Sequence, residues 1–284
     1  MRHNRINLPI FMAAPLLLAT YFPLQAQQST ATAAKDCRRY YGESVQLGAG
    51  EVRTYVVLSK NKSMETGRKA PIDVGVEIPL TVMNTLPPDM QIVNINFPVQ
   101  ARDTPIQFMM LGWNPHGHEP AGVYDRPHMD FHFYIQDFNE VMAIRPGDCS
   151  GLNCDDYQKA VKPVPPQFLP EGYSDAGMVV PMMGNHLVDL NAPEFHGKPF
   201  KQTFLYGAYD GQITFFEPMI TNEQLLSTSS KCTTVNLADE YAQAAYQPTK
   251  YCTQIDNRKH AIRVFLTEFV YRASPDQRQP LATR

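Results

Sequence analysis

Residues 127–135 read PHMDFHFYI, and this segment decides the fold that the sequence predicts. Polar and apolar side chains alternate along it, which is the pattern of a β-strand with two different faces. The apolar face is expected to belong to the core, and it carries Met129, Phe131, Phe133 and Ile135. The other face carries His128, Asp130, His132 and Tyr134. Burial of that polar face is unfavourable unless it meets water, a ligand or an ion.

Further strand patterns surround this segment. IQFMMLGW at 106–113 is expected to pair with it as a hairpin, and EVRTYVVL at 51–58, VGVEIPLTV at 74–82 and AIRVFLTEFVY at 261–271 predict more strands. The dipeptide Asp210-Gly211 predicts a tight hairpin turn, because both residue types accept positive φ. The 24 prolines argue against long helices, so short ones are expected only at 222–226 and 237–246.

The sequence therefore predicts a mainly β protein, a single-domain β-sandwich or barrel with a few short helices. A long irregular loop is expected around 145–177, where glycine and proline are frequent. The expected boundaries are a signal peptide at 1–26, a flexible leader at 27–44, a β-rich metal-binding domain at 45–275 and a tail at 276–284.

The N-terminus predicts export. Residues 1–5 are basic, residues 8–24 are mostly apolar, and Leu24-Gln25-Ala26 ends in a small residue, as cleavage sites do. A membrane-spanning helix is the alternative, but the apolar run is shorter than the roughly 20 residues a bilayer needs and contains Pro15 and Pro23. The sequence thus predicts a periplasmic or secreted protein, cleaved near Ala26, with no membrane span in its mature form.

The cysteines and the overall charge fit this interpretation. In an oxidising compartment cysteines usually pair; Cys149 with Cys154 and Cys232 with Cys252 are the expected local pairs, which leaves Cys37 unpaired. Charged residues make up 19% of the chain and the net charge is -3, so no basic stripe is present for a nucleic acid. Nucleic acid is therefore excluded as a partner, and an unknown small molecule is expected.

Four of the eight histidines lie in residues 116–132, which predicts a metal site. Neighbouring side chains on one face of a strand are roughly 6.6 Å apart and the next pair roughly 13 Å, so His128 and His132 cannot easily share an ion. His116 and His118 would return through the hairpin loop to one of them and complete a three-histidine site. Asp130 is expected either as a further ligand or as the acceptor that orients an imidazole.

Two later segments offer additional ligands, His186 in MGNHLVDL and Glu217 in TFFEPMIT. The candidate metal ligands are therefore His116, His118, His128, His132, His186 and Glu217. Glu119 and Asp130 are the candidate catalytic residues, since either carboxylate would move a proton beside a metal-activated water. Zinc is the favoured ion, although histidine and carboxylate ligands also suit iron, copper and nickel.

Three sequence blocks carry a resemblance to a known family. HGHEP with PHMDFHFY, MGNHLVD, and YDGQITFFEPMIT occur in this order between Gly48 and Leu225. They resemble a family of exported bacterial proteins of unknown function that includes a Thermus protein controlled by a sigma-E/anti-sigma-E pair. The resemblance implies a largely β domain, capable of forming homo-oligomers, with the histidine-rich block as its hallmark. It implies no reaction.

Two functions from different classes remain open. One is an exported metal-dependent enzyme, for example a hydrolase of a small ester or lactone. The other is a non-catalytic periplasmic metal-binding or envelope-stress protein that sequesters or senses an ion. A polar network that supports a binding pocket without metal is the third interpretation of the same residues.

Overall fold

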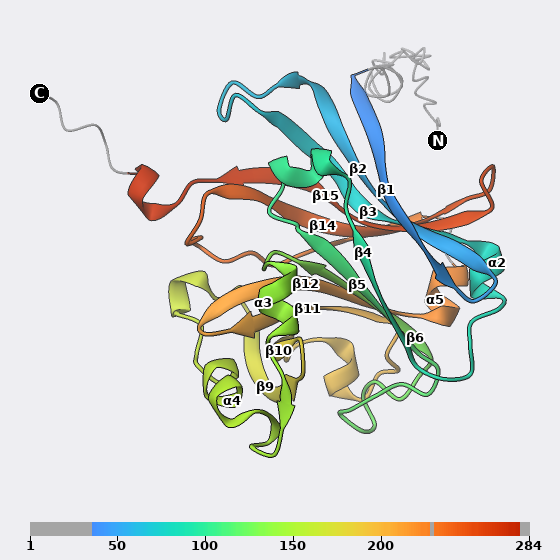
Figure 1. The fold of residues 1–284 in the computed structure, drawn as a ribbon, viewed down its shortest axis with the longest axis vertical. Coiled ribbons are helices and arrows are strands. Elements are labelled where there is room, and N and C mark those ends of the chain that lie inside the picture. The colour runs from blue at the N-terminus through green and yellow to red at the C-terminus, as the bar shows by residue number, and fades with distance from the viewer. Residues whose placement is uncertain (1–35, 228–229, 279–284) are drawn as a thin grey trace, which may run out of the picture. The chain divides into compact units, whose positions relative to one another are not determined.

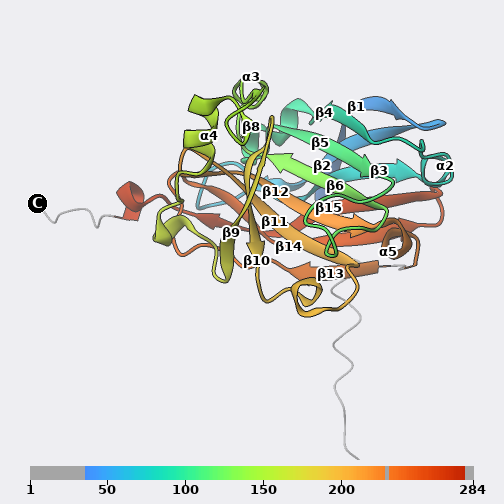
Figure 2. The same cartoon turned by 90° about the horizontal axis from the view of Figure 1, so that it is seen from below.

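Two antiparallel β-sheets face each other across an apolar core (Figures 1 and 2). The computed structural model describes residues 36–227 and 230–278, which belong to one compact unit. The predicted β-sandwich with a few short helices is confirmed. The predicted signal peptide, the first part of the leader and most of the tail lie outside the described residues.

The first sheet has six strands in the order β1-β2-β3-β15-β14-β13. Its strands are β1 (Cys37–Leu47), β2 (Gly50–Lys62), β3 (Lys69–Pro79), β13 (Ser230–Thr234), β14 (Ala245–Asp256) and β15 (Ala261–Arg272). The strand β1 begins inside the segment expected to be a flexible leader, because Arg38 to Tyr41 pair with β2. Residues 37–44 are therefore part of the sheet.

The second sheet has seven strands in the order β4-β5-β6-β12-β11-β10-β9 and carries the histidine-rich block. Its strands are β4 (Gln91–Asn96), β5 (Phe108–Asn114), β6 (His128–Tyr134), β9 (Tyr173–Val180), β10 (Gly184–Asp189), β11 (Gln202–Tyr209) and β12 (Gln212–Thr221). The predicted hairpin is confirmed, with Met110 opposite His132 and Asn114 opposite His128. The turn at Asp210-Gly211 is also confirmed, with φ of 50° and 73° at its two residues.

The helices are short, as the many prolines predict. They are α2 (Leu80–Met83), α3 (Phe138–Met142), α4 (Cys154–Ala160), α5 (Asn222–Ser227) and the 3-10 turns η1 (Val99–Asp103), η2 (Pro166–Phe168), η3 (Pro193–His196) and η4 (Pro275–Arg278). The helix predicted at 222–226 is confirmed as α5. The excursion expected to be irregular around 145–177 contains α4 and a small hairpin of β7 (Pro146–Gly147) and β8 (Gly151–Leu152) before β9 begins.

The helix predicted at 237–246 is wrong. This segment is irregular up to Ala245, where β14 begins. Its backbone bonds to other parts of the chain: Glu240 donates to the carbonyl of Gln167 at 2.9 Å. Pairing of β14 with β15 takes up its last two residues, so tertiary and sheet contacts override the local helix preference.

The two faces of β6 have different surroundings, as the alternation predicts. Met129, Phe131 and Phe133 point into the core between the sheets, where they pack with residues of β2, β3 and β15. The opposite face of the seven-stranded sheet is covered as well, because all seven residues of β6 are buried. Its cover includes Val141 from α3, Tyr124 from the loop between β5 and β6, and Phe200 before β11. The polar residues of β6 therefore lie on a buried face outside the main core.

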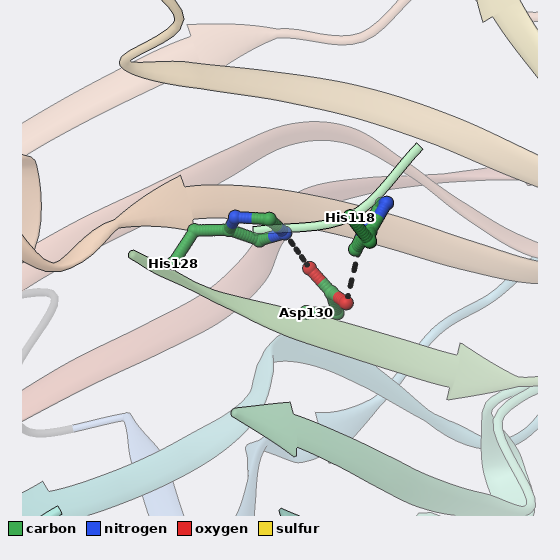
Figure 3. Close-up of side chains that lie close together, drawn as sticks. All are labelled: His118, His128 and Asp130. Atoms are coloured by element: carbon green, nitrogen blue, oxygen red, sulfur yellow. Dashed lines mark ion pairs between the residues drawn. The ribbon is translucent and has the colours of Figure 1, made fainter. Parts of the chain in front are cut away.

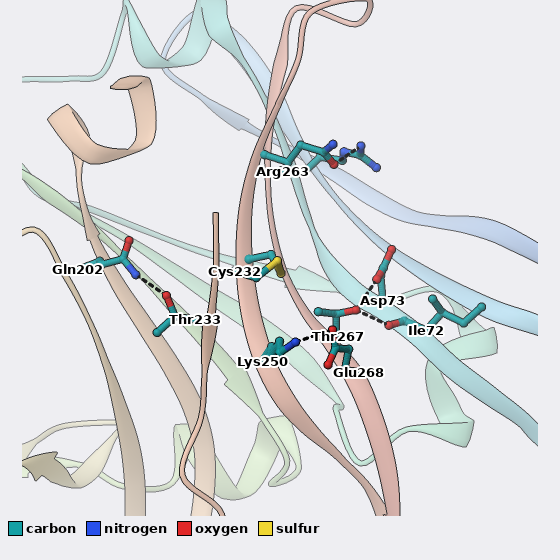
Figure 4. Close-up of a disulfide and its surroundings, with 11 residues drawn as sticks. Ile72, Asp73, Gln202, Cys232, Thr233, Lys250, Arg263, Thr267 and Glu268 are labelled. Atoms are coloured by element: carbon teal, nitrogen blue, oxygen red, sulfur yellow. Dashed lines mark hydrogen bonds and ion pairs between the residues drawn. A yellow bond between two sulfur atoms is a disulfide. The ribbon is translucent and has the colours of Figure 1, made fainter. Parts of the chain in front are cut away.

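Both predicted disulfides are present, Cys149–Cys154 beside α4 and Cys232–Cys252 between β13 and β14, and Cys37 is free. Figure 4 shows the second disulfide near Gln202, whose amide donates to the Thr233 hydroxyl at 2.9 Å and so links the two sheets. Disulfides of this kind are typical of oxidising compartments. Among the described residues no helix is long and apolar enough to cross a membrane.

Candidate metal centre

Within residues 36–227 and 230–278, two groups of side chains place three metal-capable atoms within 4.8 Å of one another. We name them by their exposure. The open group consists of His118, His128 and Asp130, and the buried group consists of His132, His186 and Glu217. Each combines two imidazoles and one carboxylate. The two groups share the strand β6, which supplies Asp130 to one and His132 to the other.

The open group is assembled by the β5–β6 hairpin and its loop (Figure 3). His128 and Asp130 are two residues apart on β6 and so share a face. His118 returns from the loop, where its backbone pairs with Tyr124. Gly117 makes this close return possible, because a Cβ there would lie 2.1 Å from the Tyr124 carbonyl oxygen, and its φ is 74°.

The distances in the open group are short and converge on the Asp130 carboxylate. His128 Nε2 lies 3.1 Å from Oδ1, and His118 Nε2 lies 3.5 Å from Oδ2. Asn114, opposite His128 on β5, donates its amide to Oδ2 at 2.6 Å. The side chain of His118 is 36% exposed while that of His128 is fully buried. One side of the open group is thus accessible to solvent.

The buried group joins three strands. His132 on β6 lies 3.2 Å from Glu217 on β12, and His186 on β10 approaches the same carboxylate at 3.7 Å, each through Nε2. His186 and Glu217 are on strands separated by β11. The carboxylate and the His132 side chain are each 2% exposed, and the His186 side chain is 7% exposed.

All four imidazoles are oriented by the same kind of contact, between Nδ1 and a main-chain carbonyl oxygen. Each Nδ1 lies within hydrogen-bond distance of a main-chain carbonyl: of Glu119 for His118 (2.7 Å), Arg126 for His128 (2.6 Å), Met110 for His132 (3.2 Å) and Met178 for His186 (3.0 Å). A carbonyl oxygen only accepts, so Nδ1 must carry the proton. The neutral form of each ring therefore turns a bare Nε2 toward a carboxylate oxygen, which is the arrangement that metal-binding histidines have.

Charges in the open group favour an ion pair. Burial acts to lower the pKa of His118, but the hydrogen bond and the charge of Asp130 more than offset this and raise it. Burial acts to raise the pKa of Asp130, and the imidazoles of His118 and His128 reverse this, so that it is lowered well below its usual range. The Asp130 carboxylate therefore stays negatively charged and can attract a cation to the space between the two imidazoles.

Charges in the buried group behave differently. Burial lowers the pKa of His132 to about 4 and also lowers the pKa of His186. Burial, followed by the negative charge of Asp130, raises the pKa of Glu217 well above its usual range. Burial thus disfavours the charged forms of all three side chains, even though the distance between His132 and Glu217 is that of an ion pair.

The nitrogen–oxygen spacing within both groups is compatible with a bound metal ion. Two ligands of a tetrahedral zinc ion, each about 2.0 to 2.1 Å from the metal, lie roughly 3.3 Å apart. The four nitrogen–oxygen distances run from 3.1 to 3.7 Å and bracket this value. Two of them, at 3.5 and 3.7 Å, are too long for good hydrogen bonds. Each group offers three candidate ligands, the number that catalytic zinc sites use.

The structure brings some of the predicted site residues together and leaves others apart from both groups. It separates His128 from His132, as the strand spacing predicts, and it places Asp130 beside His118 and His128, where its carboxylate could bind the same ion. His116 is exposed and belongs to neither group. The Glu119 side chain is exposed too, and its carboxylate accepts from the backbone of Ala121 at 2.7 Å. The expected three-histidine site is thus replaced by two histidines and an aspartate.

Two residues of the site were not anticipated from the sequence. Asn114 fixes the Asp130 carboxylate, and its place opposite His128 follows from the register of the predicted hairpin. Tyr124 packs edge-on against His118, with ring centroids 5.8 Å apart, and its buried hydroxyl has no hydrogen-bond partner in the part of the chain that the structure describes. Burial, together with the charges of Glu194, Glu217 and Asp130, raises the pKa of Tyr124, so the hydroxyl remains a donor. The only sequence signal for a role of Tyr124 was its position within the histidine-rich loop.

A large cavity lies elsewhere. It measures about 1100 Å³, and its lining includes Ile135 after β6, Tyr206 of β11, Phe216 of β12, and Tyr246 and Tyr271 of the six-stranded sheet. None of the six residues of the two groups lines it. This cavity and the candidate metal ligands are therefore separate features of the molecule.

Comparison of the chain with models of protein families, with curated proteins and with solved structures found no match. The interpretation of the site therefore depends on its own geometry.

Proposed function

We propose that this chain is an exported metal-binding β-protein that holds a divalent ion between His118, His128 and Asp130. One observation carries the proposal: both imidazoles donate Nδ1–H to the main chain and turn Nε2 toward one carboxylate at 3.1 and 3.5 Å. The Nε2 atom of His128 and the Oδ1 atom of Asp130 are buried, and among the described residues they have only each other as a partner, at 3.1 Å. A cation between these atoms would satisfy all of them.

Zinc is the ion we favour for this group. Two histidines and a carboxylate form a known type of catalytic zinc site. The same set of ligands also suits iron in the form of two histidines and one carboxylate, and copper or nickel. The proposal is therefore specific for a first-row transition metal and names zinc as its first candidate.

The chemistry we propose is hydrolysis of a small ester or lactone. A three-ligand ion with an open position can polarise a carbonyl group or activate water. The partly exposed side of His118 offers access for the substrate, and the Tyr124 hydroxyl is a nearby donor for a developing negative charge. Asp130 is engaged as a ligand and Glu119 is bonded to its own loop, so we assign neither of them as a free general base.

We propose a periplasmic or secreted location. The support is the signal-like N-terminus, with cleavage near Ala26, and the two disulfides of the sandwich. The three sequence blocks support membership of the exported bacterial family that they resemble, which includes the Thermus protein under sigma-E/anti-sigma-E control.

A non-catalytic metal-binding or envelope-stress protein is the second candidate. It is favoured because none of the candidate ligands lines the large cavity, and enzyme substrates usually bind in the larger pockets. In this role the open group would sequester or sense the ion, with no substrate at the free position.

The first test is elemental analysis of full-length exported protein purified without chelators. We expect His118→Ala to lower the metal content by one equivalent per chain. His116→Ala is the matched control, because it removes an exposed histidine two residues away that is outside both groups. Equal metal contents in the wild type and in His118→Ala would contradict the proposal.

The second test separates the two candidate functions. Wild-type protein and both variants are assayed against a panel of short-chain esters and lactones. Turnover that requires His118 but not His116 supports the hydrolase. A bound ion without turnover of any substrate in the panel supports the non-catalytic function.

A further inference from the structure

The buried group has the composition of the open group but is enclosed by protein. We propose that His132, His186 and Glu217 bind a second divalent transition-metal ion, which exchanges slowly and joins three strands of the seven-stranded sheet. This site does not depend on the function proposed for the open group. Neighbouring side chains on one face of β6 are roughly 6.6 Å apart, so the ions would be separate and would not form a closely bridged pair.

Unpartnered atoms are the first argument for this site. His132 Nε2 and Glu217 Oε2 are buried and have no hydrogen-bond partner among the described residues. Such atoms are rare in folded proteins and call for an explanation. The gap between His186 Nε2 and Glu217 Oε2 is 3.7 Å, which is too long for a hydrogen bond. One ion would bind all three side chains.

The support behind the ligands is the second argument. The Nδ1 atoms of His132 and His186 donate to the carbonyls of Met110 and Met178 at 3.2 and 3.0 Å. These carbonyls belong to β5 and β9, the strands next to β6 and β10. Both rings are therefore oriented by the regular sheet, and a small rearrangement suffices to close the ligand spacing around an ion.

The enclosure is the third argument, and it distinguishes the two groups. The ring of Phe215 packs on both imidazoles, with centroid distances of 5.0 Å to His132 and 5.4 Å to His186. Gly207 on β11 makes room for this ring, since a Cβ there would lie 2.1 Å from Phe215. Tyr134 stacks on His132 at 6.1 Å and bonds to the Met182 carbonyl. Departure of an ion therefore requires these side chains to move.

The expected consequence is mechanical. An ion held by β6, β12 and β10 would tie together strands on both sides of β11. It would bind the folded chain only, and so would stabilise it by mass action. We expect its removal to lower the midpoint of thermal unfolding by roughly 5 °C or more.

The experiment uses the wild-type full-length exported protein and follows metal content by native mass spectrometry during incubation with a chelator. We expect two ions per chain at the start. One should be lost at least roughly ten times faster than the other, since only the open group has a solvent-accessible ligand. The absence of any ion would overturn the second site without any need for a variant, and a single ion would mean that only one of the two groups is occupied, which the variants below identify.

Variants then assign each ion. Glu217→Gln should lose the slow ion and keep the fast one, whereas His118→Ala should do the reverse. Asp156→Asn is the control, because Asp156 is a buried carboxylate in α4 that accepts a hydrogen bond from the Tyr209 hydroxyl and lies outside both groups; this variant should keep two ions. If the only ion is lost in His118→Ala, this inference fails and the proposed function stands. If the only ion is lost in Glu217→Gln, the open site fails and this inference stands.

Discussion

The open group and the buried group have the same donors and differ in how the chain brings them together. The open group comes from one hairpin, with its three residues between 118 and 130, and one of its imidazoles reaches solvent. The buried group gathers residues 132, 186 and 217 from three strands and lies under Phe215. The hairpin leaves the open group accessible to solvent, whereas the three strands enclose the buried group in protein. We therefore propose ion exchange and catalysis for the open group and structural support for the buried group.

The largest effect should come from removing the cover of the buried group. Phe215→Ala deletes a fully buried ring and is expected to lower the free energy of unfolding by about 3–5 kcal/mol. It should also speed loss of the slow ion to a chelator, because the ring packs on both imidazoles. Urea unfolding and metal release measure the two effects. Phe131→Ala, on the opposite side of the same sheet, is the matched control; faster ion release in that variant as well would mean that the cover is not specific.

A second change tests the room beneath that cover. Gly207→Ala places a methyl group against the Phe215 ring, and we expect a loss of about 1–3 kcal/mol in unfolding free energy with weaker binding of the slow ion. In Gly112→Ala the new Cβ would make only ordinary contact with Asp130, at 3.4 Å. This variant is the comparison, and urea unfolding of both should show the larger loss for Gly207→Ala. Equal losses would contradict the close packing described here.

Asn114→Ala should affect the open group alone. It removes the amide that holds Asp130 at 2.6 Å, and changes of this kind cost roughly 10- to 100-fold in metal affinity. Competition with a chromogenic chelator measures the affinity of the fast ion. The slow ion provides the internal control, since Asn114 has no contact with the buried group. An unchanged affinity for the fast ion would show that Asp130 does not need this support.

The smallest effect concerns a carboxylate of the other sheet that has no imidazole partner. Burial raises the pKa of Asp73, an effect opposed by the Thr267 hydroxyl, which donates to it at 2.8 Å (Figure 4), and by two arginines. In the unfolded chain this carboxyl ionises near pH 3.9. Between the two pKa values the folded state binds a proton that the unfolded state releases, so stability falls as the pH rises.

Asp73→Asn should remove that decline. Urea unfolding of the wild type and of Asp73→Asn at a series of pH values from 3.5 upward measures the difference between them, in which contributions from both metal groups cancel. The stability of the wild type relative to the variant should decrease over this range. A constant difference would show that burial does not shift this carboxyl.

Much of the fold could be predicted because its signals are local. The alternation in residues 127–135 gave the strand and its faces, and the apolar run before it gave the hairpin partner. The segment at 237–246 failed because its hydrogen bonds go to residues distant in sequence, which local preference does not register. The same reason explains why residues 37–44 of β1 were predicted to belong to the leader: their strand pairing is with β2 and is not visible in their own sequence.

The candidate site was predictable to the same extent. Strand spacing separated His128 from His132, and the loop length was enough to return His118. The direction in which a loop turns depends on single φ values such as that of Gly117, so the sequence did not distinguish His118 from His116. The meeting of His186 with Glu217 depends on the order β12-β11-β10, which no local pattern specifies.

The disulfide Cys232–Cys252 has a consequence for where this chain can mature. It fastens the five-residue strand β13 to β14 at one margin of the six-stranded sheet. In a reducing environment β13 would be held by its ladder hydrogen bonds and by the hydrogen bond from Gln202 to Thr233, and its detachment would expose the backbone of β14 to other chains. Formation of the Cys232–Cys252 disulfide thus prevents strands of other chains from pairing with this edge of the sheet. A chain that folded before this disulfide formed would be prone to aggregate.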